Sequence, residues 1–223
     1  MTANYKSLND KERNPSRSRE AILDAAEGLF AHHGYEGTSL NQVGTQAGVS
    51  RGTPGYFFGS KEALYQAVLE RCFRRVRDAI RSGRDRALAS HEPAEVVLAG
   101  AVAEYFDFIM ANPNFVRLME REALSGAEQL NKLPSANIAA EAVAAISEEL
   151  GLDTTHGVEA AHLVLSIIGL CWFPAVHAST VVPALGFSST DADFREQRKQ
   201  HVIDLVLRGV QGRIPTTSTL SDL

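Results

Sequence analysis

The 223-residue sequence predicts an all-α protein of about nine helices, and three observations support this. Apolar residues recur at spacings of three and four along almost the whole chain, which is the period of an amphipathic helix. No run of alternating apolar and polar residues is long enough to indicate a strand. Hydrophobic residues make up 44% of the chain and charged residues 22%, a balance typical of a globular protein with a core.

Three helices are expected before residue 60. The first covers about 17–33, and Gly34 follows as the left-handed residue that ends it. A short second helix begins after Ser39, whose hydroxyl is expected to cap it, and stops at Gly48. Ser50 is placed to cap a third helix immediately afterwards. Two short helices joined by a brief glycine-containing turn are typical of a helix-turn-helix, although an ordinary corner between two helices has the same pattern.

Six helices are expected after residue 60, and an apolar stripe marks each of them. The first runs from Lys61 to about Ala89, with Gly83 as a point where it bends or weakens. The next ends at Asn112 and Pro113, because proline lacks a backbone donor and disfavours helix in the residue before it. The others are expected near 115–122, at 135–150, near 155–179 and at about 191–211.

Residues 19 to about 70 carry a set of side chains in fixed register over three helices. They are Thr38, Ser39 and Leu40, then 47–53 (AGVSRGT), then Tyr56, Phe57 and Phe58, then 60–64 (SKEAL), with Leu29, Phe30, Gly34 and Tyr35 upstream. This pattern resembles the DNA-binding domain of the TetR family of transcriptional repressors. Downstream, 114–119 (NFVRLM) followed by Glu122 is similar to some ligand-binding domains of the same family.

The resemblance implies an obligate homodimer whose third helices enter the major groove of a double-stranded DNA operator. The implied DNA contacts are hydroxyl-bearing, basic and glycine residues: Thr38, Ser39, Ser50, Arg51, Gly52, Thr53, Tyr56 and Lys61. Their hydroxyls can bind phosphates or base edges, and Arg51 can reach a guanine or a phosphate. Lys61 is expected to clamp a phosphate at the start of its helix.

The pair Pro54 and Gly55 departs from the family, which usually places a large apolar residue and an aromatic there. In a helix capped by Ser50, Pro54 removes a backbone hydrogen bond and biases Thr53 away from helical dihedrals. Glycine adds about 1 kcal/mol of helix penalty. We therefore expect the third helix to be short or distorted in the free protein.

The sequence divides into an arm and helix-turn-helix domain at 1–60, a helical ligand-binding and dimerisation domain at 61–214, and a tail at 215–223 that is expected to be disordered. An unidentified small-molecule effector is expected between helices of the second domain. The candidate lining residues are aromatic, methionine and acidic side chains on apolar stripes: Phe106, Met110, Phe115, Met119, Glu122 and Trp172. Glu122 is either paired in the core with a histidine or an arginine, or orients a polar effector.

The helix expected near 155–179 is apolar almost all round, so one face can serve its own core while another needs a second buried surface. A partner subunit is the simplest source of that surface, with the helix at 191–211 as its companion. The candidate interface residues are the apolar side chains Leu163, Ile167, Leu170, Val202, Leu205 and Val206. The longest apolar run, 163–176, is shorter than the roughly 20 residues that a bilayer requires, so no membrane contact is expected.

Charge is unevenly distributed along the chain. The formal net charge is −5, but residues 1–86 contain 14 Lys and Arg against 10 Asp and Glu, whereas 87–223 contain 8 against 17. This asymmetry is compatible with a DNA contact at the N-terminal end. A run of arginines between 71 and 86 begins about 15 Å beyond Lys61 along its helix, so most of it is expected to form a solvated face.

Other classes of function have little support in the sequence. No phosphate-binding glycine loop or nucleophile elbow is present, so neither an enzyme nor a cofactor is expected. The tightest cluster of possible metal ligands is His156, His162, Cys171 and His177. His162 and His177 would lie about 22 Å apart along a helix, so they cannot share one ion and no metal site is expected. Two cysteines and no recognisable secretion signal favour a reducing cytoplasm. The open alternatives are a ligand-released repressor, a DNA-binding regulator without a small-molecule effector, and a helical protein-interaction module.

Overall fold

A computed structural model of the protein describes residues 15–133, 138–149 and 158–210, and every regular element within these ranges is a helix. The all-α prediction is confirmed. The chain divides into two compact units, 1–68 and 69–223. The long helix α4 (Lys61–Ala89) begins in the first unit and ends in the second.

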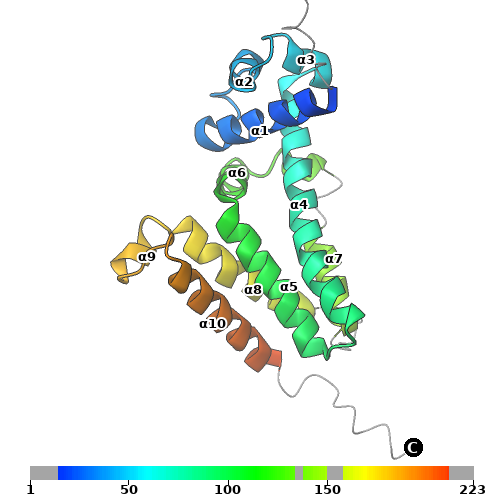
Figure 1. Ribbon diagram of the computed structural model, residues 1–223, viewed down its shortest axis with the longest axis vertical. Helices are drawn as coiled ribbons and strands as arrows, with labels where there is room; N and C mark the ends of the chain where they lie inside the picture. The colour runs from blue at the N-terminus through cyan, green and yellow to red at the C-terminus, as the bar shows by residue number, and fades with distance from the viewer. Residues whose placement is uncertain (1–14, 134–137, 150–157, 211–223) are drawn as a thin grey trace, which may run out of the picture. The chain divides into compact units, whose positions relative to one another are not determined.

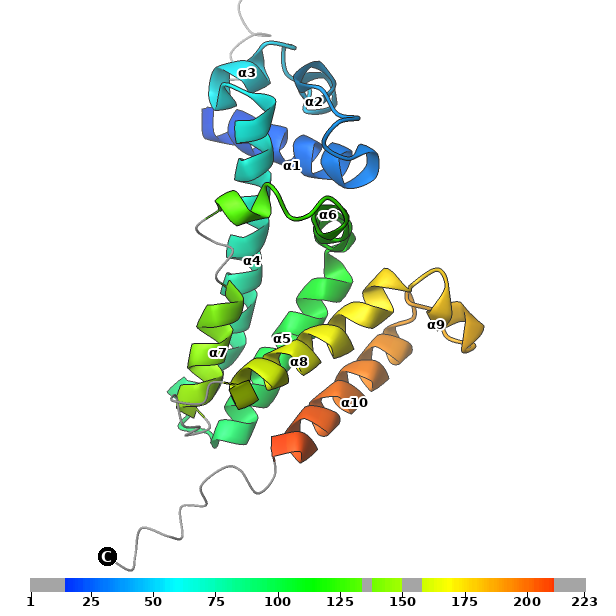
Figure 2. The ribbon, with the colours of Figure 1, turned by 180° about the vertical axis from the view of Figure 1, so that it is seen from behind.

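The first unit contains α1 (Pro15–His33), α2 (Leu40–Gln46), α3 (Thr53–Phe58) and the first turns of α4. Figures 1 and 2 show α2 and α3 joined by a short turn, and both helices contact α1. Apolar side chains from these elements form the core of the unit: Ile22, Leu23, Ala26, Phe30, Val43, Pro54, Leu64, Tyr65 and Val68. The Phe30 and Tyr65 rings pack edge to face with centroids 4.8 Å apart, a favourable aromatic arrangement.

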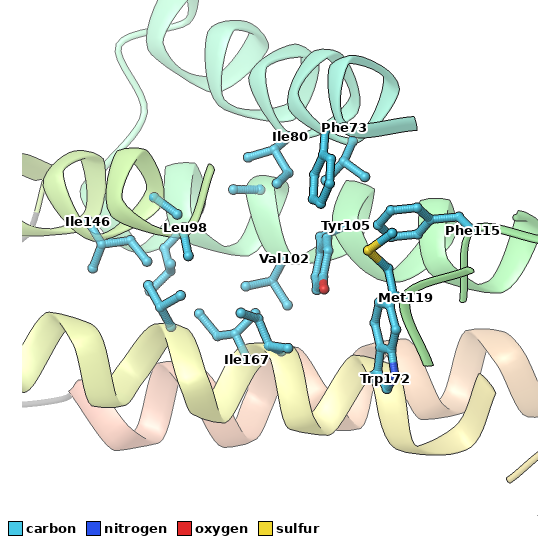
Figure 3. A pocket seen from close by; sticks show the side chains of 16 residues that line it. Phe73, Ile80, Leu98, Val102, Tyr105, Phe115, Met119, Ile146, Ile167 and Trp172 are labelled. Atoms are coloured by element: carbon cyan, nitrogen blue, oxygen red, sulfur yellow. The ribbon is translucent and has the colours of Figure 1, made fainter. Parts of the chain in front are cut away.

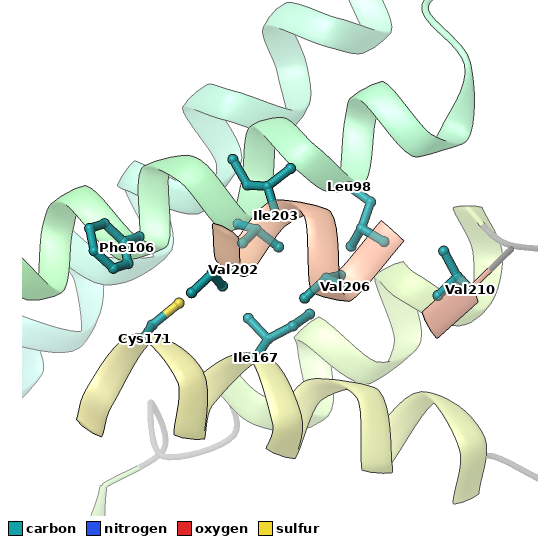
Figure 4. Packing of buried hydrophobic residues seen from close by; sticks show 9 residues of the cluster. Leu98, Phe106, Ile167, Cys171, Val202, Ile203, Val206 and Val210 are labelled. Atoms are coloured by element: carbon teal, nitrogen blue, oxygen red, sulfur yellow. The ribbon is translucent and has the colours of Figure 1, made fainter. Parts of the chain in front are cut away.

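The second unit contains the remainder of α4 and six further α-helices within the described ranges. They are α5 (Ala94–Ala111), α6 (Pro113–Leu124), α7 (Ile138–Glu149), α8 (Val158–Val176), α9 (Val181–Ala184) and α10 (Ala192–Val210), with a 3-10 turn η1 (Leu130–Lys132) after α6. α5, α8 and α10 lie side by side and enclose the apolar core drawn in Figure 4. This core consists of Leu98, Val102, Phe106, Ile167, Cys171, Val202, Ile203, Val206 and Val210.

Gly83 lies inside α4 at the point where α5 approaches. A Cβ atom at Gly83 would lie 2.5 Å from the carbonyl oxygen of Gly100 and 2.7 Å from Cγ of Glu104. The two glycines therefore allow the backbones of α4 and α5 to come closer than any side chain would permit. The residue that the sequence marked as a weak point thus has a packing role in the second unit.

The third helix begins later than the sequence predicted. Its N-cap is Gly52, so the prediction that Ser50 caps it is wrong, and Pro54 lies in its first turn. Proline removes no helical hydrogen bond there, because the first N–H groups of a helix have no partner inside it. α3 is 6 residues long, so it is as short as expected, but Pro54 starts the helix and does not interrupt it.

The C-terminal half contains one helix that the sequence did not reveal. The 4-residue helix α9 follows α8, so the helix expected at 191–211 is α10. A helix of one turn has too few residues to show an apolar period, which explains the omission. The arm before residue 15 and the tail at 215–223 lie outside the described residues.

Candidate DNA-binding surface and ligand pocket

The turn between α2 and α3 depends on one capping serine and two glycines. The Ser39 N–H donates to Oε1 of Gln42 at 2.8 Å, and the Gln42 N–H donates to the exposed Ser39 hydroxyl at 3.3 Å. Gly48 ends the turn with a φ of 67°, which side chains rarely adopt. A Cβ atom at Gly44 would lie 3.0 Å from the Ser50 carbonyl oxygen, so this glycine admits the close turn. The predicted helix-turn-helix is confirmed.

The start of α3 presents polar groups to solvent. Arg51 and Gly52 are exposed, and the Tyr56 side chain is 86% exposed. The hydroxyls of Ser50 and Thr53 lie 2.6 Å apart and share a hydrogen bond. One hydroxyl of this pair still has its own proton to donate, because each carries one donor and two acceptor sites. Residues 50–53 form a continuous exposed or half-exposed segment, and Tyr56 is exposed one turn further along α3, so the five residues have the chemistry needed to contact DNA.

Two other implied phosphate contacts have partners within the first unit. Thr38 is 3% exposed and donates its hydroxyl to the Gly34 carbonyl oxygen at 2.9 Å, so it supports the loop before α2 and leaves the set of DNA contacts. The Lys61 ammonium donates to the Tyr35 carbonyl oxygen at 3.1 Å and lies 4.2 Å from the centre of that ring. It is also 3.8 Å from a carboxylate oxygen of the exposed Glu36. Because an ammonium has three donors, Lys61 retains capacity for a phosphate.

The second unit contains an apolar cavity of about 240 Å³, shown in Figure 3. α4 borders one side with Phe73, and α8 borders the opposite side with Trp172. α5 contributes Val102 and Tyr105 between them, while α6 and α7 lie at the two ends. The residues that line the cavity include no charged side chain. A concave apolar space with few polar groups is typical of a small-molecule site.

Three of the six residues that the sequence proposed for a ligand site line this cavity: Phe115, Met119 and Trp172. The Phe115 ring packs edge to face against Trp172, with centroids 5.7 Å apart. The indole N–H of Trp172 donates to Oε1 of Glu120 at 2.7 Å. Trp172 therefore offers the cavity its apolar ring, while its one polar atom already has a partner.

The other three proposed ligand contacts lie away from the cavity and stabilise the fold of the second unit. Phe106 is fully buried in the core of the second unit, and Met110 packs against that core. Glu122 is 4% exposed, and one of its carboxylate oxygens accepts the Leu130 N–H at 3.2 Å. Glu122 therefore anchors the turn after α6. None of these three residues borders the cavity, and we remove them from the candidate ligand site.

Sequence reasoning missed most of the cavity lining, including Phe73, Ile80, Val102, Tyr105 and Ile146. These residues lie on the apolar stripes of their helices, so the sequence cannot distinguish them from core residues. The separation of the helices decides whether such a side chain meets another side chain or an open space. A phenol on an apolar stripe, as at Tyr105, was the one available signal.

The proposed dimer interface also needs correction. Ile167, Val202 and Val206 are buried in the core of a single chain, as Figure 4 shows. Leu163 and Leu170 are partly buried against the same core. The sequence showed two apolar faces on this helix, and it could not indicate which of them α5 and α10 cover. Ile167, Val202 and Val206 therefore stabilise one protomer, whereas Leu163 and Leu170 keep part of their surface exposed and stay proposed interface residues.

The apolar side chains that remain exposed on α8 are Leu165, at 64%, and Phe173, at 48%. Gly169 lies between them and is exposed, and spacings of four residues place all three on one face of the helix. Leu205 on α10, the sixth proposed interface residue, is 42% exposed. α8 is long and apolar enough to cross a membrane by length and composition, and 28% of Glu159–Val176 is buried within the chain. The core helix of a soluble protein meets the same criterion, so the expectation of no membrane contact stays a prediction.

The histidine cluster considered as a metal site contains His156, which lies outside the described residues. Among the residues that are described, no group of three or more His, Cys, Asp or Glu side chains is arranged to hold a metal ion. Cys171 is buried in the core, and burial raises the pKa of its thiol to about 12. Its thiol is therefore neutral at physiological pH.

Comparison with known families finds two matches. The family model described as bacterial regulatory proteins, tetR family, matches residues 22–68. The model described as tetracyclin repressor-like, C-terminal domain, matches residues 95–206. The first match contains the helix-turn-helix, and the second contains all but the first residue of α5 together with α6, α7, α8 and α9.

Individual relatives resemble the chain over most of its length. It is 29% identical to the HTH-type transcriptional repressor NicS of Pseudomonas putida, over 87% of this chain and 93% of that protein. It is 27% identical to the HTH-type transcriptional regulator RutR of Escherichia coli K12, over 93% of this chain and 97% of that protein. Among solved structures, a TetR-like transcriptional regulator from Rhodococcus sp. RHA1 shares the fold with a TM-score of 0.64 at 18% identity, over 87% of this chain and 96% of the other.

Proposed function

The chain belongs to the TetR family of DNA-binding transcriptional regulators, and from this premise we propose that it is a repressor which a small-molecule effector releases from a palindromic operator. The observation that carries the proposal is the presence, in one chain, of an exposed helix-turn-helix and an apolar cavity. α4 connects them covalently, because it begins in the first unit and lines the cavity in the second. Since the relatives are bacterial transcription regulators, we also propose a cytoplasmic protein without enzymatic activity or membrane contact.

For the DNA-binding domain, proposed as 1–60 with Lys61 at its edge, the exposed groups divide into two roles. Arg51, Thr53 and Tyr56 are proposed to reach base edges, since they lie at the exposed start and outer face of α3. The proposed phosphate and backbone contacts are Ser39, Ser50, Gly52 and Lys61. Replacing Tyr56 with alanine should change the preferred base at one operator position, whereas loss of a phosphate contact should weaken all sequences alike.

A homodimer supplies the second recognition helix that a palindromic operator requires. The exposed stripe of α8, Leu165, Gly169 and Phe173, is the proposed contact, because these apolar residues have no cover within the described chain. The absence of a Cβ atom at Gly169 would let a helix of the partner approach closely. The proposal thus moves the interface from the core residues of α8 to its outer face.

Replacing Leu165 with arginine tests this interface. The expected result is a monomer in sedimentation velocity at micromolar concentration, with loss of operator binding, because a charge would face an apolar partner surface. The same change at Leu124, an 89% exposed leucine at the end of α6, is the matched control and should leave the dimer intact. A stable dimer of the Leu165→Arg variant would show that the two chains meet elsewhere.

The cavity is the proposed effector site of the domain proposed as 61–214. Phe73, Val76 and Ile80 of α4 line it, so a ligand that fills the cavity contacts the helix that continues into the first unit. A change in the position of α4 is the proposed route to lower operator affinity. Linkage then requires that DNA weaken effector binding by the same factor, typically five- to 150-fold.

The test is operator binding measured during a screen of small molecules. A compound that binds the protein and lowers operator affinity supports the proposal. A regulator that keeps its operator affinity while a compound occupies the cavity would be a DNA-binding protein without effector control. Failure to bind any specific DNA would favour a helical protein-interaction module.

A further inference from the structure

Among the described residues that line the cavity, only Tyr105 and Trp172 carry an N–H or O–H group on the side chain. Carbon atoms from five helices make up nearly all of its wall, and Met119 contributes a thioether. The indole N–H of Trp172 is already paired with Glu120. The phenol hydroxyl of Tyr105 is the only hydroxyl among the lining residues, and Figure 3 shows its oxygen among apolar side chains.

The Tyr105 hydroxyl has no hydrogen-bond partner among the described residues. Its oxygen is not one of the fully buried side-chain atoms that lack a partner, so part of its surface is accessible. Because Tyr105 lines the cavity, its hydroxyl can reach a ligand there, and the buried Cys171 thiol interacts with it from the side of the core. Burial raises the pKa of Tyr105 above its ordinary value, because the phenolate would be poorly solvated there. The group is a neutral phenol at any physiological pH and can donate its proton to an acceptor.

The size and charge of the cavity restrict what can occupy it. An apolar cavity of about 150 Å³ accommodates benzene. A cavity of about 240 Å³ therefore accommodates a molecule of on the order of ten non-hydrogen atoms. No cationic side chain lines the space, so an anion would lose its hydration without gaining a counter-charge. An uncharged ligand loses far less, and it gains one hydrogen bond if it carries an acceptor.

On the basis of the proposed function, we propose that the effector is a small, uncharged and largely hydrocarbon molecule with one hydrogen-bond acceptor, which the Tyr105 hydroxyl recognises. Ketones, esters and lactones of this size belong to the class. Carboxylates and ammonium compounds do not. Tyr105 is the residue that distinguishes such a molecule from a hydrocarbon of the same shape.

Three probes with equal numbers of non-hydrogen atoms test the class: acetophenone, α-methylstyrene and benzoate. The first is neutral with an acceptor, the second is neutral without one, and the third is an anion. Calorimetry measures each affinity on the full-length protein, without DNA. The fluorescence of Trp172 reports occupancy of the cavity, because it is the single tryptophan of the chain and lines that space.

Tyr105→Phe should weaken the binding of acetophenone about 3- to 10-fold, the effect of one net hydrogen bond. The same substitution should leave the affinity for α-methylstyrene unchanged, because that probe accepts no hydrogen bond. Benzoate should bind most weakly of the three. The affinity for acetophenone should stay constant between about pH 6 and 9, because the raised pKa keeps Tyr105 protonated.

Tyr35→Phe is the matched control, since it removes a phenol hydroxyl from the first unit, and it should leave all three affinities unchanged. Thermal denaturation checks that Tyr105→Phe folds. Tightest binding of benzoate, an equal loss of both neutral probes in Tyr105→Phe, or no binding of any probe would overturn the proposal. Operator affinity with saturating acetophenone tests the proposed function separately, because Tyr105-dependent binding that leaves this affinity unchanged contradicts effector release and not the ligand class.

Discussion

Replacing Lys61 with alanine separates two expected contributions of this side chain, one within the first unit and one to DNA. In the free protein its ammonium donates to the Tyr35 carbonyl oxygen at 3.1 Å and lies over the ring of the same residue. Hydrogen bonds from charged groups contribute roughly 1.5–3 kcal/mol, and the Lys61 side chain is only 26% exposed. We expect the free energy of unfolding to fall by about 1–2 kcal/mol in Lys61→Ala.

The contribution to DNA binding has a separate signature in its dependence on salt. Each phosphate contact adds about 0.9 to the slope of log affinity against log salt concentration. The affinity deficit of Lys61→Ala should therefore shrink about 3.5-fold between about 50 and 200 mM salt. A residue that only stabilises the fold would give a deficit that does not depend on salt in this way.

Fluorescence anisotropy with a labelled operator at a series of salt concentrations measures this slope, and thermal denaturation measures stability. Lys61→Arg keeps the charge and should keep the native slope. Glu36→Gln removes the exposed carboxylate 3.8 Å from the Lys61 ammonium, so it should raise affinity for DNA at low salt. If Lys61→Ala has the native salt slope, Lys61 does not contact a phosphate and its role is confined to the first unit.

Two further substitutions test the crossing of α4 and α5 and the effect of a bound effector on operator affinity. Gly83→Ala should lower its stability by about 1–3 kcal/mol in thermal unfolding, because the new Cβ would lie 2.5 Å from the Gly100 carbonyl oxygen. Gly28→Ala is the control, because a Cβ atom there would meet no neighbouring atom within 4 Å, and it should raise the free energy of unfolding by up to about 1 kcal/mol. Equal effects at the two sites would contradict the close crossing of α4 and α5. Arg75→Ala removes a 2.6 Å hydrogen bond from α4 to Asn112 at the corner of α5 and α6, so an effector should still bind but should lower operator affinity less. Unchanged coupling in anisotropy titrations with effector would show that this bond does not contribute to the effect of the effector on operator affinity.

Local backbone chemistry made much of the first unit predictable. Ser39 caps α2, and Gly34 and Gly48 adopt positive φ values of 74° and 67°, as their places in the sequence indicated. Each of these features depends on residues a few positions apart. The start of α3 was misplaced because its N-cap, Gly52, makes no side-chain hydrogen bond that a sequence pattern could reveal.

The sequence by itself determined the helical class, the helix-turn-helix and its resemblance to a regulator family, because periodicity, caps and turn glycines act over short distances. It also showed that α8 has more apolar surface than one chain covers. Only the tertiary structure decided that Ile167 faces the core while Leu165 faces outward, and that Tyr105 borders a cavity while Phe106 does not. These assignments depend on the distances and rotations of helices far apart in the sequence, and an apolar stripe has the same appearance whether it meets a core, a ligand or a partner.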